Sequence, residues 1–207
     1  MALSKLLVAT HNPAKITEIK YGLDPLIKQG VELVTLSDLK IRQEPEETGK
    51  TYKDNSFLKA KYYSKLSGLP SIADDGGFSI PSLNNEPGVK SKLWLGHPVS
   101  DEKLIEHTLF RLQNKRDGER KAFLETCIVF YDPKSKIEIY ETEKINGYVA
   151  KSPFNKWIRG FPFRALLITD KFNKYYDELT DEEHKQINHR LIALRRLVKK
   201  IQSLVLK

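Results

Sequence analysis

The chain has 207 residues, of which 40% are hydrophobic and 30% are charged. A chain of this length buries a sizeable core without disulfides or metal ions, and its composition is typical of a folded globular protein. The lone cysteine, Cys127, excludes an internal disulfide framework, no apolar run reaches the roughly 18 residues of a membrane span, and the apolar stretch after Met1 is too short for a secretory signal. We therefore expect one domain over residues 1–207, or two lobes that share a cleft, in a reducing compartment, the cytoplasm.

The first half of the chain predicts alternating strands and helices. A buried strand at 5–9 precedes a helix at 14–23, and an alternating pattern predicts a strand at 31–36. Residues 42–49 form a polar loop, and 51–67 form a helix that Gly68 and Pro70 end. A short strand at 71–73 is stopped by the turn-forming residues 74–77.

The second half continues this alternation. Ser100 caps a helix that extends to about residue 113, and strands at 121–131 and 136–143 form a hairpin around a Pro-containing turn. A further strand lies at 165–169, and a capping box of Thr180 and Glu183 opens a helix whose apolar stripe extends from Ile187 to Val205. This stripe is a core face or a dimer seam, and the core is favoured. The pattern predicts an α/β fold around a mixed β-sheet flanked by helices.

The net charge of +8 is concentrated at the end of the chain. Seven Lys or Arg and no Asp or Glu lie between Lys185 and Lys207. Such a field would suit nucleic acid, an acidic partner or a small polyphosphate. A solvated basic face on a terminal helix explains the same charges, so nucleic-acid binding ranks last among the functions considered.

The turn from Thr10 to Lys15 is the first candidate site. A helix that begins after a strand offers backbone N–H groups and a positive dipole end, which suit phosphate, and Lys15 adds a cation. The glycines of a Walker loop are absent, and Asn and Pro also serve simple connecting turns.

The pair Asp74 and Asp75 is the second candidate site. Carboxylates at the end of a buried strand lie where α/β sheets bind ligands. Neighbouring side chains of an extended chain point to opposite faces, so only one of the two is expected to face the ligand. That carboxylate would hold Mg²⁺ or take a proton from water, whereas the alternative is an ordinary turn.

Three weaker signals complete the set. The acidic loop 44–49 suits a hard cation or is simply a surface loop. Lys59 lies four residues after Asn55 and therefore on the same helix face. His189 and Arg190 lie beside the apolar stripe and border a ligand cleft or pack as structural residues.

These segments, taken together and in order, resemble the inosine triphosphate pyrophosphatases, a family of house-cleaning enzymes for deaminated purine nucleotides. The matching segments are 9–15, 47–56 with 58–60, 73–78, 87–89 and 188–190. The resemblance implies hydrolysis of a nucleoside triphosphate to the monophosphate and pyrophosphate with Mg²⁺. It also implies an elongated fold of two lobes with a cleft between them, and a homodimer.

The resemblance also implies roles for individual residues. It assigns Glu47 and Asp75 to the metal, and Asp75 with Asp74 to activation of water. Substrate binding is assigned to Thr10, His11, Asn12, Lys15, Lys59, Gly76 and Lys92. Contact with the nucleotide base is assigned to Phe161, Phe163, Arg164, His184, His189 and Arg190. These assignments fit the chemistry, since a metal and several cations neutralise phosphate charge while a carboxylate positions the nucleophile.

The chain departs from the family mainly where the base is read. The family loop Gly-Phe-Gly-Tyr-Asp-Pro is here Gly-Phe-Pro-Phe-Arg-Ala, so Arg164 inverts a charge and offers only donors. His184 replaces a Lys, Asn188 replaces a Ser, and Gly76 replaces a Ser. We expect the hydrolytic chemistry to be retained with an altered or relaxed base preference. A catalytically silent nucleotide-binding relative is the alternative.

Overall fold

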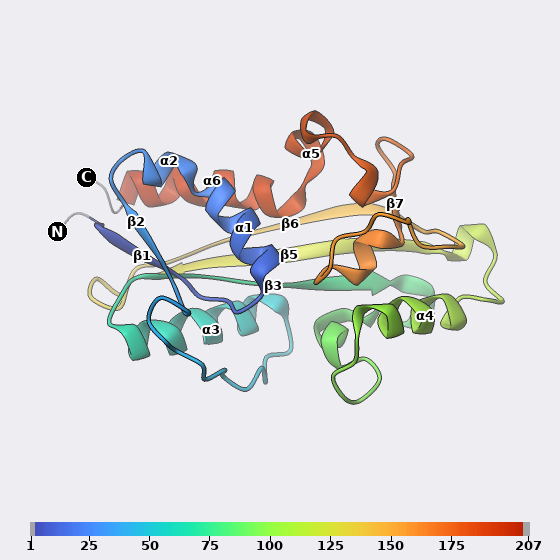
Figure 1. Cartoon of the computed structure of the whole chain (residues 1–207), viewed down its shortest axis with the longest axis horizontal. Coiled ribbons are helices and arrows are strands. Elements are labelled where there is room, and N and C mark those ends of the chain that lie inside the picture. Colours follow the sequence, from blue (N-terminus) through green and yellow to red (C-terminus); the bar gives the residue numbers. More distant parts are fainter. Residues whose placement is uncertain (1–2, 205–207) are drawn as a thin grey trace. The chain divides into compact units, whose positions relative to one another are not determined.

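In the computed structural model, which describes residues 3–204, a seven-stranded mixed sheet has the strand order β2-β1-β3-β5-β6-β7, with β4 paired to β3 (Figure 1). The strands are β1 (Lys5–Val8), β2 (Glu32–Thr35), β3 (Ser71–Ile80), β4 (Glu86–Pro87), β5 (Lys121–Tyr131), β6 (Glu138–Val149) and β7 (Leu167–Thr169). The α-helices are α1 (Pro13–Gly22), α2 (Asp24–Ile27), α3 (Tyr52–Ser67), α4 (Asp101–Arg111), α5 (Asp181–Ile187) and α6 (His189–Leu204). Short 3₁₀-helices are η1 (Pro81–Leu83), η2 (Gly88–Leu93), η3 (Asp117–Glu119), η4 (Pro162–Ala165) and η5 (Tyr176–Glu178). The predicted α/β fold with a mixed sheet is confirmed.

The chain divides into two compact units, in line with the two lobes expected. The first unit contains the described residues up to Asp75, Thr126–Glu143 and the described residues from Arg190 onward. The second unit contains Gly76–Glu125 and Lys144–His189. Strand β3 therefore passes from the first unit to the second after Asp75.

The first unit carries helices on both faces of its strands, and β1 is parallel to both β2 and β3. Leu7 of β1 lies opposite Val34 of β2 and pairs with Ser71 of β3. One apolar cluster packs α1, α2 and α6 against one face, and it contains Ile19, Leu23, Leu26, Ile72, Ile128, Phe130, Leu194 and Val198. Helix α3 covers the other face, where Ser56 donates a hydrogen bond of 2.8 Å to the carbonyl of Cys127 (Figure 1).

The second unit has a core of its own. Its apolar cluster joins Leu104 and Ile105 of α4 to Phe78 of β3, Phe163 of η4 and the fully buried Tyr176. Within residues 3–204 no helix is both long enough and apolar enough to span a bilayer.

Local signals set several element ends, and the predicted end of α3 at Gly68 is confirmed. Asn12 caps α1, and Thr51 caps α3 through a capping box with Asp54. Gly68 ends α3 in the left-handed conformation at φ 70°, which glycine adopts without strain. Thr180 and Glu183 form the predicted capping box of α5.

Three predicted elements were wrong in extent. The strand predicted at 136–143 is β6, which begins at Glu138 and continues to Val149. The strand at 71–73 does not stop at the paired aspartates but continues through Asp74–Gly77 to Ile80, because both carboxylates have cationic partners on helices that flank the sheet. The single terminal helix is two helices, because Asn188 takes an extended conformation between α5 and α6. The core interpretation of the apolar stripe is confirmed for Leu191, Leu194 and Val198, whereas Ile187 packs in the second unit and Val205 lies outside the described residues.

Candidate active site

Asp74 and Asp75 point to opposite faces of β3, as the alternation of an extended strand requires. Asp74 is fully buried on the face that carries α1 and α6. Its Oδ2 lies 2.7 Å from Lys15 Nζ and 3.3 Å from an Arg190 Nη, and its Oδ1 accepts a hydrogen bond from the Thr126 hydroxyl. Asp74 is therefore fully engaged by side chains from three elements.

The charges around Asp74 extend into a chain of ion pairs. Arg190, which is 3% exposed, also pairs with Glu18 of α1 at 2.5 Å. Burial opposes ionisation of Asp74, but the charges of Arg190 and Lys15 hold its pKa well below the usual range. Burial likewise disfavours charge on Arg190, yet Asp74 and Glu18 raise the pKa of its guanidinium. For Lys15, burial outweighs the attraction of Asp74 and lowers its pKa.

Asp75 faces α3 and has a different set of partners. Asn55 donates a hydrogen bond of 3.1 Å to one carboxylate oxygen, and Lys59 donates one of 3.1 Å to the other. The same ammonium donates a bond of 3.0 Å to Glu47 Oε1. Burial disfavours the charge of Lys59, but Asp75 and Glu47 together raise its pKa above the ordinary value. The predicted helix face of Asn55 and Lys59 is confirmed.

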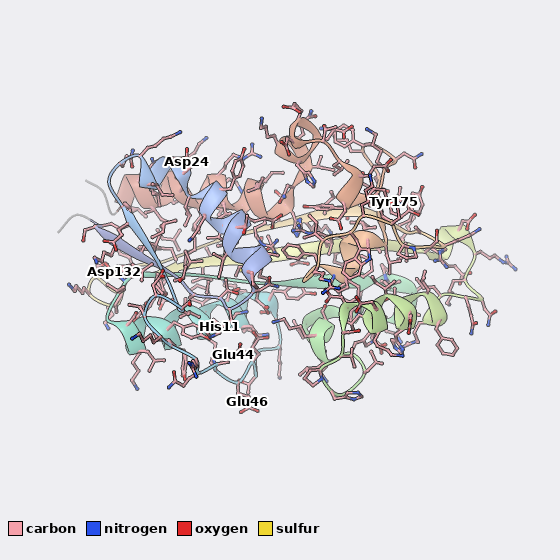
Figure 2. All side chains as sticks on the ribbon, viewed as in Figure 1. His11, Asp24, Glu44, Glu46, Asp132 and Tyr175 are labelled. Atoms are coloured by element: carbon pink, nitrogen blue, oxygen red, sulfur yellow. The ribbon has the colours of Figure 1, made fainter. Side chains whose placement is uncertain are left out.

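The loop that carries Glu47 is anchored to the same helix. The Gly49 N–H donates a hydrogen bond of 2.8 Å to Asn55 Oδ1, and a Cβ at Gly49 would collide with that oxygen. Asn55 therefore holds the loop with one end of its amide and Asp75 with the other. Glu44 and Glu46 of this loop are exposed (Figure 2), and Glu47 is the loop carboxylate that reaches Lys59.

Glu47 and Asp75 have the donor chemistry that Mg²⁺ requires. Their oxygens converge on one point, which Lys59 Nζ occupies at 3.0 and 3.1 Å. Mg²⁺ is commonly held by one or two carboxylates plus substrate phosphates and water. In residues 3–204 no cluster of three or more acidic, His or Cys side chains forms a protein-only metal site. The pair therefore fits a metal whose other ligands come from a phosphate and water.

The turn at Thr10–Lys15 uses part of its binding capacity internally. Asn12 Oδ1 accepts hydrogen bonds from the N–H groups of Ala14 and Lys15 at 2.9 and 3.2 Å. Thr10 Oγ1 accepts one from the Asn12 N–H at 3.2 Å. The His11 ring lies edge-on to Tyr63 at 6.1 Å (His11 is labelled in Figure 2), and its Nε2 has no hydrogen-bond partner among the described residues. Lys15, which pairs with Asp74, is thus the lysine that this turn contributes to the site.

The residues assigned to the base lie in the second unit, with the exception of Arg190. Phe163 stacks on Phe78 at 5.0 Å between ring centroids. Arg164 is buried, and its guanidinium lies 3.6 Å from the centroid of Phe161 and 4.8 Å from that of Tyr176. The inverted charge of the aromatic loop is therefore held between two rings.

Two histidines of this unit, His184 and His189, lie beside Tyr176. His189 Nδ1 lies 3.3 Å from the Tyr176 hydroxyl, and the His184 ring lies edge-on to the Tyr176 ring at 5.1 Å. Lys92 is exposed in η2, and Gly76 is half-buried in β3. Arg190, by contrast, belongs to the ion pairs of Asp74, so its predicted contact with a purine stays a prediction.

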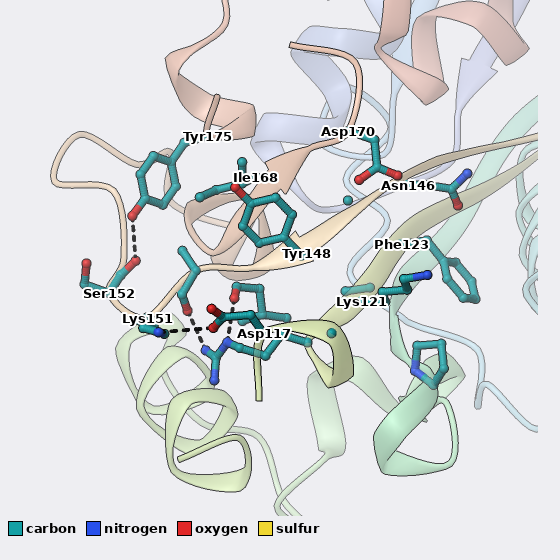
Figure 3. A pocket seen from close by; sticks show the side chains of 17 residues that line it. Asp117, Lys121, Phe123, Asn146, Tyr148, Lys151, Ser152, Ile168, Asp170 and Tyr175 are labelled. Atoms are coloured by element: carbon teal, nitrogen blue, oxygen red, sulfur yellow. Dashed lines mark hydrogen bonds and ion pairs between the residues drawn. The ribbon is translucent and has the colours of Figure 1, made fainter. Parts of the chain in front are cut away.

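A separate pocket of about 850 Å³ opens on the second unit (Figure 3). It is lined by side chains of β5, β6 and β7 and the loops beside them, including Phe123, Asn146, Tyr148, Asp170 and Tyr175. None of the predicted site residues lines it. The candidate site is therefore defined by the carboxylates and cations described above rather than by this pocket.

Sequence reasoning missed two members of the site, Glu18 and Thr126. Glu18 lies three residues after Lys15 and so on the same face of α1, which is the signal that would have found it. Thr126 is in the middle of β5 and carries no local signal.

Comparison with known proteins agrees with the family resemblance of the motifs. Residues 6–200 match the model of the Ham1 family. The dITP/XTP pyrophosphatase of Thermus thermophilus is 36% identical over 94% of this chain and 90% of that protein, and the Bacillus subtilis dITP/XTP pyrophosphatase is 31% identical over 97% and 98%. The solved structure of the Staphylococcus aureus Ham1 protein superposes with a TM-score of 0.81 at 27% identity, covering 96% of this chain and 98% of that one.

Proposed function

The chain belongs to the Ham1 family, and we propose that it is a nucleoside-triphosphate pyrophosphatase that releases pyrophosphate from a deaminated purine nucleotide in the presence of Mg²⁺. Membership confirms the resemblance drawn from its motifs. The observation that carries the proposal is the convergence of Glu47 and Asp75 on Lys59, beside the ion pairs of Asp74. Two carboxylates and several cations in one place suit a metal-bound polyphosphate.

The surroundings of each site residue decide the role that we propose for it. Lys15 and Lys59 would bind phosphate oxygens and offset the charge that develops on them. Asp74, held by Lys15 and Arg190, would keep those two cations in position. Asp75 is then the carboxylate that orients or deprotonates the attacking water. Bound Mg²⁺, held by Glu47 and Asp75, would act as a Lewis acid toward the phosphate.

The residues that would recognise the nucleotide base are assigned from the family resemblance and from the chemistry of the aromatic loop. Phe161 and Phe163 would supply stacking surface, while His184 and His189 would supply ring nitrogens. Arg164 provides only donors where the family has an acceptor. We expect the base preference to differ from that of relatives that keep the Asp, and the buried position of Arg164 between Phe161 and Tyr176 supports this.

The decisive experiment measures pyrophosphate release from ITP, XTP, dITP and the four standard triphosphates with Mg²⁺. Turnover of at least one of them with production of the monophosphate supports the proposal. Inactivity on all of them, in protein shown to be folded by circular dichroism, would refute it. Nucleotide binding by calorimetry without turnover would instead identify a silent binding relative.

The assembly and location are further parts of the proposal. We expect a homodimer in the cytoplasm, from the family resemblance and the lone cysteine. Light scattering after size-exclusion chromatography tests the dimer, and a monomer at micromolar concentration would contradict it. Steeply salt-dependent duplex binding would revive the nucleic-acid alternative. Arg196 and Lys200 argue against that alternative, because they pair with Glu141 and Glu143.

A further inference from the structure

We propose that Lys59 is an exchangeable counter-cation, which takes the place of the divalent metal between Glu47 and Asp75 in the free protein and leaves it when a polyphosphate binds. Metal and nucleotide would then enter together, and the free protein would bind the metal weakly. This inference rests on the proposed function, because it concerns the same carboxylates.

The first argument is charge balance. The carboxylates and cations of the site are Glu18, Glu47, Asp74 and Asp75 on one side and Lys15, Lys59 and Arg190 on the other. Every one of these carboxylates already has a cationic partner within 3.3 Å. The free protein is thus almost neutral at this point without any metal. A metal ion would gain little unless one of the resident cations moved.

The second argument is position. Lys59 Nζ lies 3.0 Å from Glu47 and 3.1 Å from Asp75, so it fills the point at which their oxygens converge. A Mg²⁺ ion bound to the same two oxygens would lie about 2.0–2.1 Å from each of them. The ion and the ammonium cannot share that point, and their like charges repel strongly at such separations. One must leave before the other can bind.

The third argument is which cation can move. Arg190 is 3% exposed and anchored by Glu18 and Asp74. Lys59 is also buried, with a side chain that is 11% exposed, but it contacts Glu47, whose side chain is 39% exposed, so its ammonium lies beside a carboxylate that borders solvent. Its flexible stem allows the ammonium to turn from the carboxylates to a phosphate oxygen, which replaces the lost ion pairs. A polyphosphate therefore supplies both the new partner for Lys59 and the remaining ligands for the metal.

The test measures Mn²⁺ binding to the free protein, without nucleotide, by electron paramagnetic resonance. The wild type is compared with Lys59→Met, which removes the charge and keeps the length. We expect Lys59→Met to bind Mn²⁺ at least about tenfold more tightly, since a like charge next to the ion is gone. Lys59→Arg should show no gain, and adding Glu47→Gln to Lys59→Met should abolish it.

Lys61→Met is the matched control, because Lys61 is on the same helix, pairs with Glu138 and does not contact the site. Equal gains in Lys61→Met and Lys59→Met would overturn the inference, as would Mn²⁺ binding in the wild type as tight as in Lys59→Met. Thermal unfolding checks that each variant folds, and Lys59→Gln replaces Lys59→Met if the latter does not. If triphosphates are hydrolysed but the affinity gain is absent, the inference fails and the proposed function stands. If the gain is present without hydrolysis, the counter-cation is correct and the proposed function fails.

Discussion

Asp74 and Asp75 are neighbours in the chain but lie in opposite environments. Asp74 is fully buried, and both of its carboxylate oxygens have partners among the side chains of Lys15, Arg190 and Thr126. Asp75 is 7% exposed and shares one ammonium with Glu47. The difference separates two tasks that we propose for an identical side chain: Asp74 orients cations, and Asp75 would bind metal and water once Lys59 has moved away.

The largest effect that would test this separation is on stability. Asp74→Asn leaves Lys15 and Arg190 buried without their central carboxylate, and we expect it to lower the free energy of unfolding by about 3–5 kcal/mol. Urea denaturation measures this change. Asp75→Asn is the control and should lower the free energy of unfolding by less, because Lys59 keeps Glu47 as its partner. Equal stability of the two variants would remove the distinction between the two aspartates.

The next effect is on catalysis. Asp75→Asn should reduce pyrophosphate release by about 100-fold or more, since a positioned acid–base group typically contributes that much. The variant should retain the circular dichroism spectrum of the wild type. A rate above about one tenth of the wild-type rate would show that Asp75 does not act on water.

The pH dependence of stability gives a further test of the role of Asp74. The pKa of Asp74 is held well below its usual range in the folded protein, so its contribution to stability is present above the unfolded pKa and is lost as the pH falls through the folded one. We expect the stability gap between wild type and Asp74→Asn to be largest above about pH 5 and smaller at about pH 3. Urea titrations at both pH values measure it, and a gap that widens in acid would contradict the ion pairs described.

The smallest expected effect extends the comparison to the second unit. Arg164→Asp restores the acceptor found in the family loop, and we expect it to raise the preference for ITP over ATP by about tenfold, the discrimination of one good base contact. The ratio of kcat/KM for the two nucleotides measures this change. Arg164→Gln removes the charge without adding a carboxylate and is the matched control. An unchanged ratio in both would place Arg164 outside base reading.

Much of this arrangement was predictable because it follows from local periodicity. Strand alternation predicted opposite faces for the two aspartates, and helical spacing placed Asn55 and Lys59 together. The continuation of β3 was not predictable, because Asp and Gly favour turns unless distant cations such as Lys59 and Arg190 hold them in the sheet. The break at Asn188 was likewise hidden, since the apolar repeat continues across it.

The low reactivity of the Cys127 thiol is a consequence of its place in the sheet. It is 1% exposed on β5, and burial together with the charge of Asp74 raises its pKa to about 12. At neutral pH it is therefore a shielded, protonated sulfur that alkylating reagents reach only when the sheet opens. The rate at which Cys127 is alkylated, followed by mass spectrometry, therefore reports the rate of that opening at a single natural site.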